Sequence, residues 1–113
     1  MLFKDCLFCK IIRGQIPCYK VFENEKILAF KDINPVAKVH VLIIPKIHIE
    51  NTGQRKHIDI LGELLISAED IAHKLNIFES GYRIITNRGK DAGQIIDHIH
   101  LHLIGGEPLN PIN

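Results

Sequence analysis

The chain has 113 residues, of which 46% are hydrophobic and 24% charged, as in one ordinary globular domain. Its 14 Lys and Arg nearly balance its 13 Asp and Glu. The formal net charge of +1 excludes the strong basic field that attracts nucleic acid or anionic membrane. The N-terminal segment has neither a signal-peptide core nor a transmembrane span, and three cysteines suit a reducing compartment. We therefore expect one cytoplasmic domain over residues 1–113, with no nucleic-acid or membrane partner.

The first half of the chain predicts a short helix followed by three strands. Apolar spacing over residues 7–12 favours the helix. Strands are expected at 19–23 and 27–31, joined as a hairpin by a turn at 24–25, and a β-branched run predicts a third strand at 40–44.

The second half predicts one long helix and two more strands. Apolar residues recur at helical spacing over 58–75, and strands are expected at 82–86 and 97–103 with a glycine-containing loop, 87–94, between them. This order favours an α+β domain in which a five-stranded antiparallel sheet carries the long helix on one face. The other face is then free for a site.

Three histidines alternate with aliphatic residues in the last predicted strand. Because side chains of a strand alternate between its faces, His98, His100 and His102 must share one face, while the residues between them fill the core. Successive imidazoles would lie about 6.5 to 7 Å apart along the strand. The core residues fix the register, so the imidazoles cannot easily slip inward.

Such histidines have three interpretations. They can be hydrogen-bonded or surface residues without chemistry. They can belong to a catalytic zinc site, since neutral imidazole is a common zinc ligand, although three on one straight strand span too far for one ion.

In the third interpretation the middle residue, His100, is a nucleophile, because a neutral imidazole carries a lone pair at pH 7. His102, and His40 from an adjacent strand, would then stabilise charge on non-bridging phosphate oxygens. Amides of the 87–94 loop could also approach a phosphate closely, although glycine with charged residues is equally typical of an exposed turn.

The histidines, the Leu103-Ile104-Gly105-Gly106 that follows and Gly93-Gln94 upstream resemble the histidine-triad (HIT) superfamily, in particular its Hint-like branch of nucleotide-binding proteins. Three further stretches fall in the family's order and spacing: 30–35, 40–46 and 81–87. The resemblance implies a HIT-like α+β fold, a homodimer whose two sheets join, and cleavage of purine nucleoside phosphoramidates or related adenylylated compounds.

By position, the resemblance makes His100 the nucleophile that forms a nucleotidyl-histidine intermediate, with His102 and His40 on the α-phosphate and His98 completing the catalytic set. It implies a substrate-binding set that comprises Leu7, Phe8, Ile11, Ile16, Phe30, Asp32, Ile33, Asn87, Gly93 and Gln94. Within this set, Asp32 and Ile33 resemble the ribose-binding pair. The apolar members could equally be ordinary core residues.

One position departs from the pattern. The residue after Gln94 is often a small hydroxyl residue in Hint-like proteins, and here it is Ile95. This change leaves open a competing class, a nucleotide-binding regulatory protein whose hydrolysis is vestigial.

The Cys6-Leu7-Phe8-Cys9 spacing suits either a pair of metal ligands or a pair of small buried side chains. Several members of the superfamily bind a structural zinc through such a pair and two histidines. The resemblance therefore implies a zinc site made by Cys6, Cys9, His48 and His98, with no catalytic cofactor. Cys18 has no evident partner and is expected to be structural or exposed.

Overall fold

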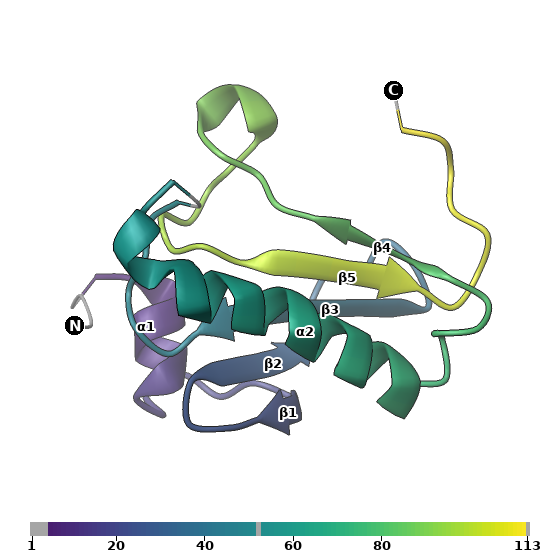
Figure 1. Cartoon of the computed structure of the whole chain (residues 1–113), viewed down its shortest axis with the longest axis horizontal. Helices are drawn as coiled ribbons and strands as arrows, with labels where there is room; N and C mark the ends of the chain where they lie inside the picture. The colour runs from purple at the N-terminus through teal and green to yellow at the C-terminus, as the bar shows by residue number, and fades with distance from the viewer. Residues whose placement is uncertain (1–4, 52, 113) are drawn as a thin grey trace.

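The computed structural model describes residues 5–51 and 53–112. Five antiparallel strands form one sheet in the order β1-β2-β3-β5-β4 (Figure 1). The elements are α1 (Leu7–Ile12), β1 (Lys20–Glu23), β2 (Ile27–Lys31), β3 (Val39–Pro45), α2 (Ile58–Lys74), β4 (Tyr82–Ile85) and β5 (Leu101–Gly105), with 3-10 turns at Arg55–His57 and Lys90–Ala92. The predicted α+β architecture is confirmed, and none of the described helices is long and apolar enough to cross a bilayer.

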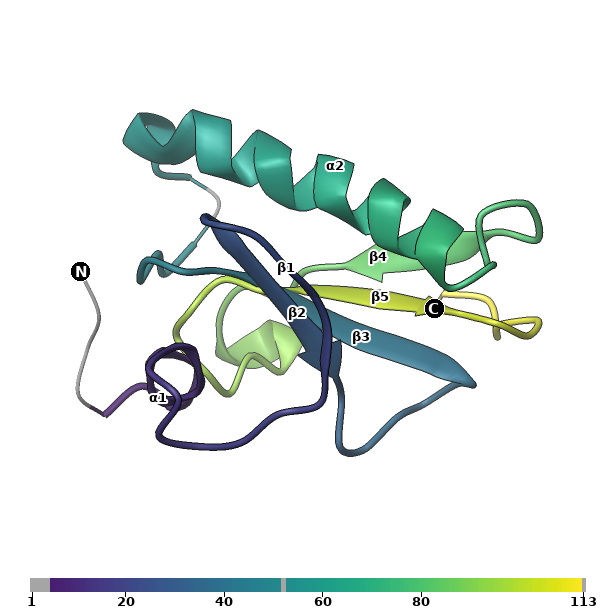
Figure 2. The same ribbon diagram turned by 90° about the horizontal axis from the view of Figure 1, so that it is seen from below.

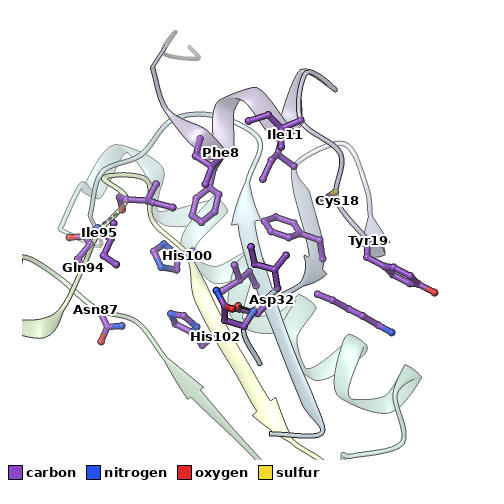
Figure 3. A pocket seen from close by; sticks show the side chains of 18 of the residues that line it. Phe8, Ile11, Cys18, Tyr19, Asp32, Asn87, Gln94, Ile95, His100 and His102 are labelled. Atoms are coloured by element: carbon purple, nitrogen blue, oxygen red, sulfur yellow. Dashed lines mark hydrogen bonds between the residues drawn. The ribbon is translucent and has the colours of Figure 1, made fainter. Parts of the chain in front are cut away.

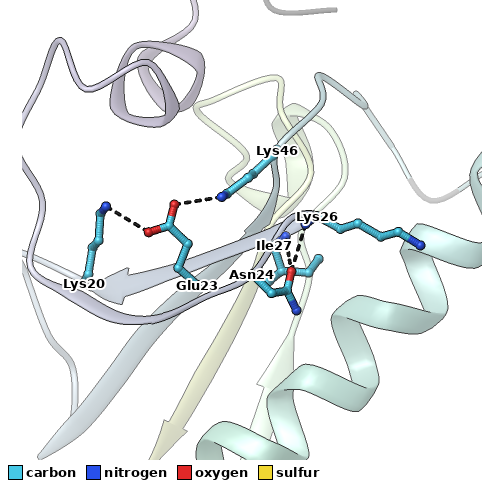
Figure 4. A network of polar contacts seen from close by, with 6 residues as sticks. All are labelled: Lys20, Glu23, Asn24, Lys26, Ile27 and Lys46. Atoms are coloured by element: carbon cyan, nitrogen blue, oxygen red, sulfur yellow. Dashed lines mark hydrogen bonds and ion pairs between the residues drawn. The ribbon is translucent and has the colours of Figure 1, made fainter.

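The β1–β2 hairpin forms where expected, and its turn is held by Asn24 (Figure 4). The Asn24 Oδ1 accepts hydrogen bonds from the backbone N–H groups of Lys26 at 2.9 Å and Ile27 at 2.8 Å. Glu23, just before the turn, pairs with Lys46 at 2.7 Å, beyond the end of β3. The turn residues therefore help to set the register between β1 and β2.

Helix α2 covers one face of the sheet, and α1 lies against the opposite face (Figure 2). The buried face of α2 packs on sheet residues that belong to the larger core cluster. A smaller apolar cluster lies on the α1 side and consists of Phe8, Leu28, Phe30, Leu42 and Ile44. The face expected to be free is thus partly covered by α1, which forms one wall of a cavity.

The last strand begins later than predicted. The ladder of β5 starts at Leu101, whereas the expected strand was 97–103. In the β3–β5 register, Ile44 and Pro45 would stand opposite His100 and Ile99, but the ladder stops at the Ile43–Leu101 pair. Instead, the Ile99 N–H donates to the carbonyl of Ile49 at 2.6 Å. The segment before β5 therefore runs beside the chain that leaves β3.

The alternation of side chains continues across this change. Ile99, Leu101 and Leu103 are buried in the core cluster beneath α2. His98 and His100 are also buried, but their rings contact Phe8 on the α1 side. Core burial thus keeps the histidines on one face even outside the ladder.

Candidate functional site

A cavity of about 690 Å³ opens on the face that carries α1 (Figure 3). The residues expected to bind substrate all line this cavity, from α1, β2, the segments that follow them and the loop before β5: Leu7, Phe8, Ile11, Ile16, Phe30, Asp32, Ile33, Asn87, Gly93 and Gln94. Segments far apart in the sequence therefore meet in one concave surface of the size that binds small molecules.

The cavity has an apolar end and a polar end. Phe8, Ile11 and Phe30 provide apolar surface, with the Phe8 and Phe30 rings edge to face at a centroid distance of 5.9 Å. His100 and His102 lie on the side of Phe8 away from Ile11 (Figure 3). The arrangement suits an amphiphilic ligand with a flat apolar part and an anionic part.

The backbone sets the tautomer of His100. Its Nδ1 lies 2.8 Å from the carbonyl oxygen of His98, and a carbonyl can only accept. The Nδ1 therefore carries the proton, and a neutral ring has its lone pair on Nε2. His100 is 8% exposed and lines the cavity, so this ring nitrogen is the one available to a ligand.

His102 is oriented by His40. The backbone N–H of Val36 donates to His40 Nδ1 at 3.1 Å, so the proton of the neutral His40 ring is on Nε2. That Nε2 lies 2.9 Å from His102 Nδ1, which accepts. Consequently the Nε2 of His102 carries a proton and can donate to an anion. Burial, with His100 and His40 nearby, lowers the pKa of His102 to about 4.

His40 lies behind His102 and is not among the residues that line the cavity. Its Nε2 is also 3.3 Å from Asp32 Oδ2. Burial lowers the pKa of His40, and the Asp32 carboxylate opposes this shift. The resemblance implied a direct contact between His40 and the phosphate. In this structure His40 instead contacts His102, and His102 faces the cavity.

His98 occupies a different position from the other predicted catalytic histidines. Its side chain is fully buried and does not line the cavity; only its carbonyl reaches His100. The ring instead points to the cysteines of α1. A direct contact between the His98 ring and a ligand in the cavity is therefore not supported by this geometry.

The cysteine pair and two histidines form one compact cluster. Cys6 Sγ and Cys9 Sγ lie 3.3 and 3.6 Å from His98 Nδ1, and Cys9 Sγ lies 3.3 Å from His48 Nδ1. All four ligand atoms lie within 4.8 Å of one another. Two thiolates and two imidazoles at this separation are a donor set that suits tetrahedral zinc.

The protonation pattern of this cluster also fits a metal ion. His98 Nε2 donates to the Pro45 carbonyl at 3.0 Å, which leaves the lone pair on Nδ1, the atom facing both cysteines. Burial lowers the pKa of His98 to about 4 and also lowers that of His48, whereas it raises that of the Cys6 thiol, which would release its proton when a metal ion binds. The imidazoles are therefore neutral at pH 7, as a metal ligand requires.

A catalytic zinc on the three strand histidines does not fit this arrangement. His98 turns to the cysteines, whereas His102 joins His40 and Asp32 in a second cluster of possible ligands. In that second cluster, the proton that Val36 fixes on His40 Nε2 occupies the position a metal ion would need. The hydrogen-bonded interpretation is therefore better supported there.

The cavity also includes residues that sequence reasoning did not assign to substrate binding: Pro17, Cys18, Tyr19, Lys31, Asn34, Leu42, Ile95 and Ile96. Leu42 could have been found, because it shares the strand face of His40. Cys18, which was expected to be structural or exposed, is half-buried in the cavity wall. Cys18 lies between α1 and β1, in a segment without the helix or strand periodicity that would predict where a side chain points. Ile95 is 92% exposed at the cavity.

Comparison with known proteins shows the family of the chain. The HIT domain family matches residues 13–109. The chain is 42% identical over 111 residues to the purine nucleoside phosphoramidase of Escherichia coli K12, covering 96% of this chain and 93% of that protein. It is 46% identical over 108 residues to a 14 kDa zinc-binding protein of Zea mays, covering 92% and 84%.

A solved structure extends the similarity to three dimensions. The HIT family hydrolase from Clostridium thermocellum superposes with a TM-score of 0.92 at 46% identity, over 97% of each chain. Fold, histidine arrangement and sequence therefore lead to one conclusion. The chain belongs to the HIT domain family.

Proposed function

We propose that this single-domain protein, acting in the cytoplasm, hydrolyses purine nucleoside phosphoramidates or related adenylylated compounds through a nucleotidyl-histidine intermediate. The observation that carries the proposal is the 2.8 Å bond from His100 Nδ1 to the His98 carbonyl, which leaves a lone pair on Nε2 within the cavity. The similarity to a protein named purine nucleoside phosphoramidase supports this substrate class.

The reaction is two displacements at phosphorus. His100 Nε2 forms a bond to phosphorus as the bond to the amine breaks, and a proton from solvent goes to the departing nitrogen. Water then attacks phosphorus and gives one proton to solvent, which releases the nucleotide and restores the neutral imidazole. The Nε2–H of His102 donates to a non-bridging oxygen as charge develops there in both steps.

The cavity offers a place for each part of the substrate. The purine base packs against Phe8, Ile11 and Phe30, where apolar surface is removed from water. The sugar lies at Asp32 and Ile33. The loop residues Asn87, Gly93 and Gln94 lie on the phosphate side, with Gln94 held by its own bonds to Gly89 and Ile96.

Turnover of adenosine 5′-phosphoramidate tests the proposal. We expect the wild-type protein to release AMP and a quenched sample to contain a covalent nucleotide adduct, both absent in His100→Ala. AMP binding without turnover by the wild type would contradict hydrolysis and favour a nucleotide-binding regulatory protein.

We further propose that Cys6, Cys9, His48 and His98 hold a structural zinc ion. The similarity to a protein named zinc-binding and the compact cluster support this proposal. The ion would tie α1, which forms a wall of the cavity, to the segment that carries His100. A site closed by four protein ligands has no position for water, so its contribution is to stability and not to the chemical step.

A homodimer is the proposed assembly. β4 is an outer strand of the sheet, and all its residues are half-buried in the isolated chain. Antiparallel pairing of β4 with its copy about a two-fold axis would satisfy this edge and join the two sheets. Leu65 and Ile66 of α2, 55% and 63% exposed, provide further apolar surface. Light scattering at micromolar concentration tests the assembly, and a monomer would contradict it.

A further inference from the structure

Each oxygen of the Asp32 carboxylate already lies beside a protein N–H group. Its Oδ1 accepts from the Asn34 N–H at 2.8 Å, and its Oδ2 lies 3.3 Å from His40 Nε2. The side chain is nevertheless 17% exposed and lines the cavity. A carboxylate has about four lone-pair sites, so sugar hydroxyls can bind the same group while these bonds persist.

The contact between Asp32 and His40 continues toward the cavity through His102. The backbone also ties the two strands at this point, since the Asp32 N–H donates to the His40 carbonyl at 3.0 Å. His40 has one Nε2 proton, which faces both Asp32 Oδ2 and His102 Nδ1, at 3.3 and 2.9 Å. Its side chain is 5% exposed, so water does not readily replace either acceptor. The result is a chain of polar groups from the sugar end of the cavity to its phosphate end.

We propose that Asp32 is a positioning residue that acts through His40 to hold His102 as an Nε2–H donor toward the reacting phosphate. This inference rests on the proposed function and deepens it, because one carboxylate then serves both the sugar hydroxyls and the imidazole that contacts phosphate. If Asp32 only bound the sugar, its replacement would lower turnover only of substrates that carry those hydroxyls. If Asp32 positions His102, its replacement lowers turnover of every substrate with a reacting phosphate.

The chemistry of the site requires a carboxylate. Asp32 accepts from the Asn34 N–H, and its negative charge 3.3 Å from His40 Nε2 favours a proton on that nitrogen, the one that His40 donates to His102. Asp32→Asn keeps the acceptor for the Asn34 N–H at almost unchanged volume, but it removes the charge beside His40 Nε2 and can place an amide donor against that N–H. Release of His40 allows its ring, and with it His102, to turn or change tautomer.

The kinetic test uses two substrates, adenosine 5′-phosphoramidate and its 2′,3′-dideoxy analogue, which lacks both sugar hydroxyls. We expect Asp32→Asn to lower kcat about tenfold or more on both, the range seen when the orienting partner of a functional imidazole is removed. Asp70→Asn, an exposed carboxylate on α2, is the matched control and should keep wild-type kcat. Equal kcat for Asp32→Asn and wild type on the dideoxy substrate would overturn the inference.

Nitrogen-15 NMR of the histidine rings at pH 7 tests the inference without turnover. In the wild type, His40 and His102 should both carry their proton on Nε2, and in Asp32→Asn the His102 signals should shift toward a mixture of tautomers. A wild-type His102 with its proton on Nδ1, or unchanged signals in a folded variant, would overturn the proposal. If the wild type cleaves neither substrate, the proposed function fails, and the NMR result alone decides the role of Asp32.

Discussion

The ring of Phe8 contacts the rings of both His98 and His100 edge to face, at centroid distances of 5.7 and 5.1 Å. Phe8 is 3% exposed and stands between the two cysteines of α1 in sequence. One aromatic side chain therefore joins the cysteine–histidine cluster, the proposed nucleophile and the apolar end of the cavity.

Replacing Phe8 by leucine should weaken nucleotide binding and lower stability together. The change removes ring contacts with Phe30 and both histidines, and imperfect filling of the space should cost about 1–3 kcal/mol of unfolding free energy. Calorimetric titration with AMP and thermal unfolding measure the two effects. Phe78→Leu, which removes a ring stacked on His73 outside the cavity, is the control. Equal AMP affinity of both variants would contradict a role for Phe8 in the base site.

Removal of zinc should lower the thermal midpoint without a direct effect on the chemical step. At a free zinc concentration about 100 times the dissociation constant, binding contributes about 2.7 kcal/mol to stability. We expect Cys9→Ser to lose stoichiometric zinc in elemental analysis and to unfold at lower temperature. Cys18→Ser should retain zinc, because Cys18 lies outside the cluster. Full zinc content in Cys9→Ser would refute the assigned ligands.

Acidification should destabilise the protein partly through His102. Its pKa is about 4 in the folded chain against 6.5 for the free side chain, so between these values the unfolded chain binds more protons. Stability is therefore complete above about pH 6.5 and falls as pH drops toward 4. Between pH 7 and 5 the thermal midpoint should fall more in wild type than in His102→Gln. Parallel curves would show that His102 makes no such contribution.

Ile95→Ser should improve turnover of substrates with poor leaving groups. Ile95 is 92% exposed at the cavity, so its loss should change stability by less than about 0.5 kcal/mol. A hydroxyl there can add one hydrogen bond in the transition state, which is worth about a fivefold increase in kcat. Alkylamine-substituted phosphoramidates measure the gain. A lower kcat would indicate that the isoleucine itself assists the reaction.

Most of the fold was predictable because local patterns determine it. Apolar periodicity placed α2, and turn residues such as Asn24 placed the β1–β2 hairpin. Except for β5, the expected boundaries agree with the observed elements to within one residue. The start of β5 was wrong because the chain before Leu101 leaves β3, and the Ile99 N–H donates to the Ile49 carbonyl, a contact between distant segments that no local pattern encodes.

The sequence by itself determined that His98, His100 and His102 share one face, since alternation along an extended segment and burial of the residues between them allow no other arrangement. Only the tertiary structure decided what each histidine meets. His98 turns to the cysteines, His100 is given its tautomer by a backbone carbonyl, and His102 joins His40 and Asp32 from other strands. Hydrogen bonds between distant segments select a ring's direction and proton, and no local pattern encodes them.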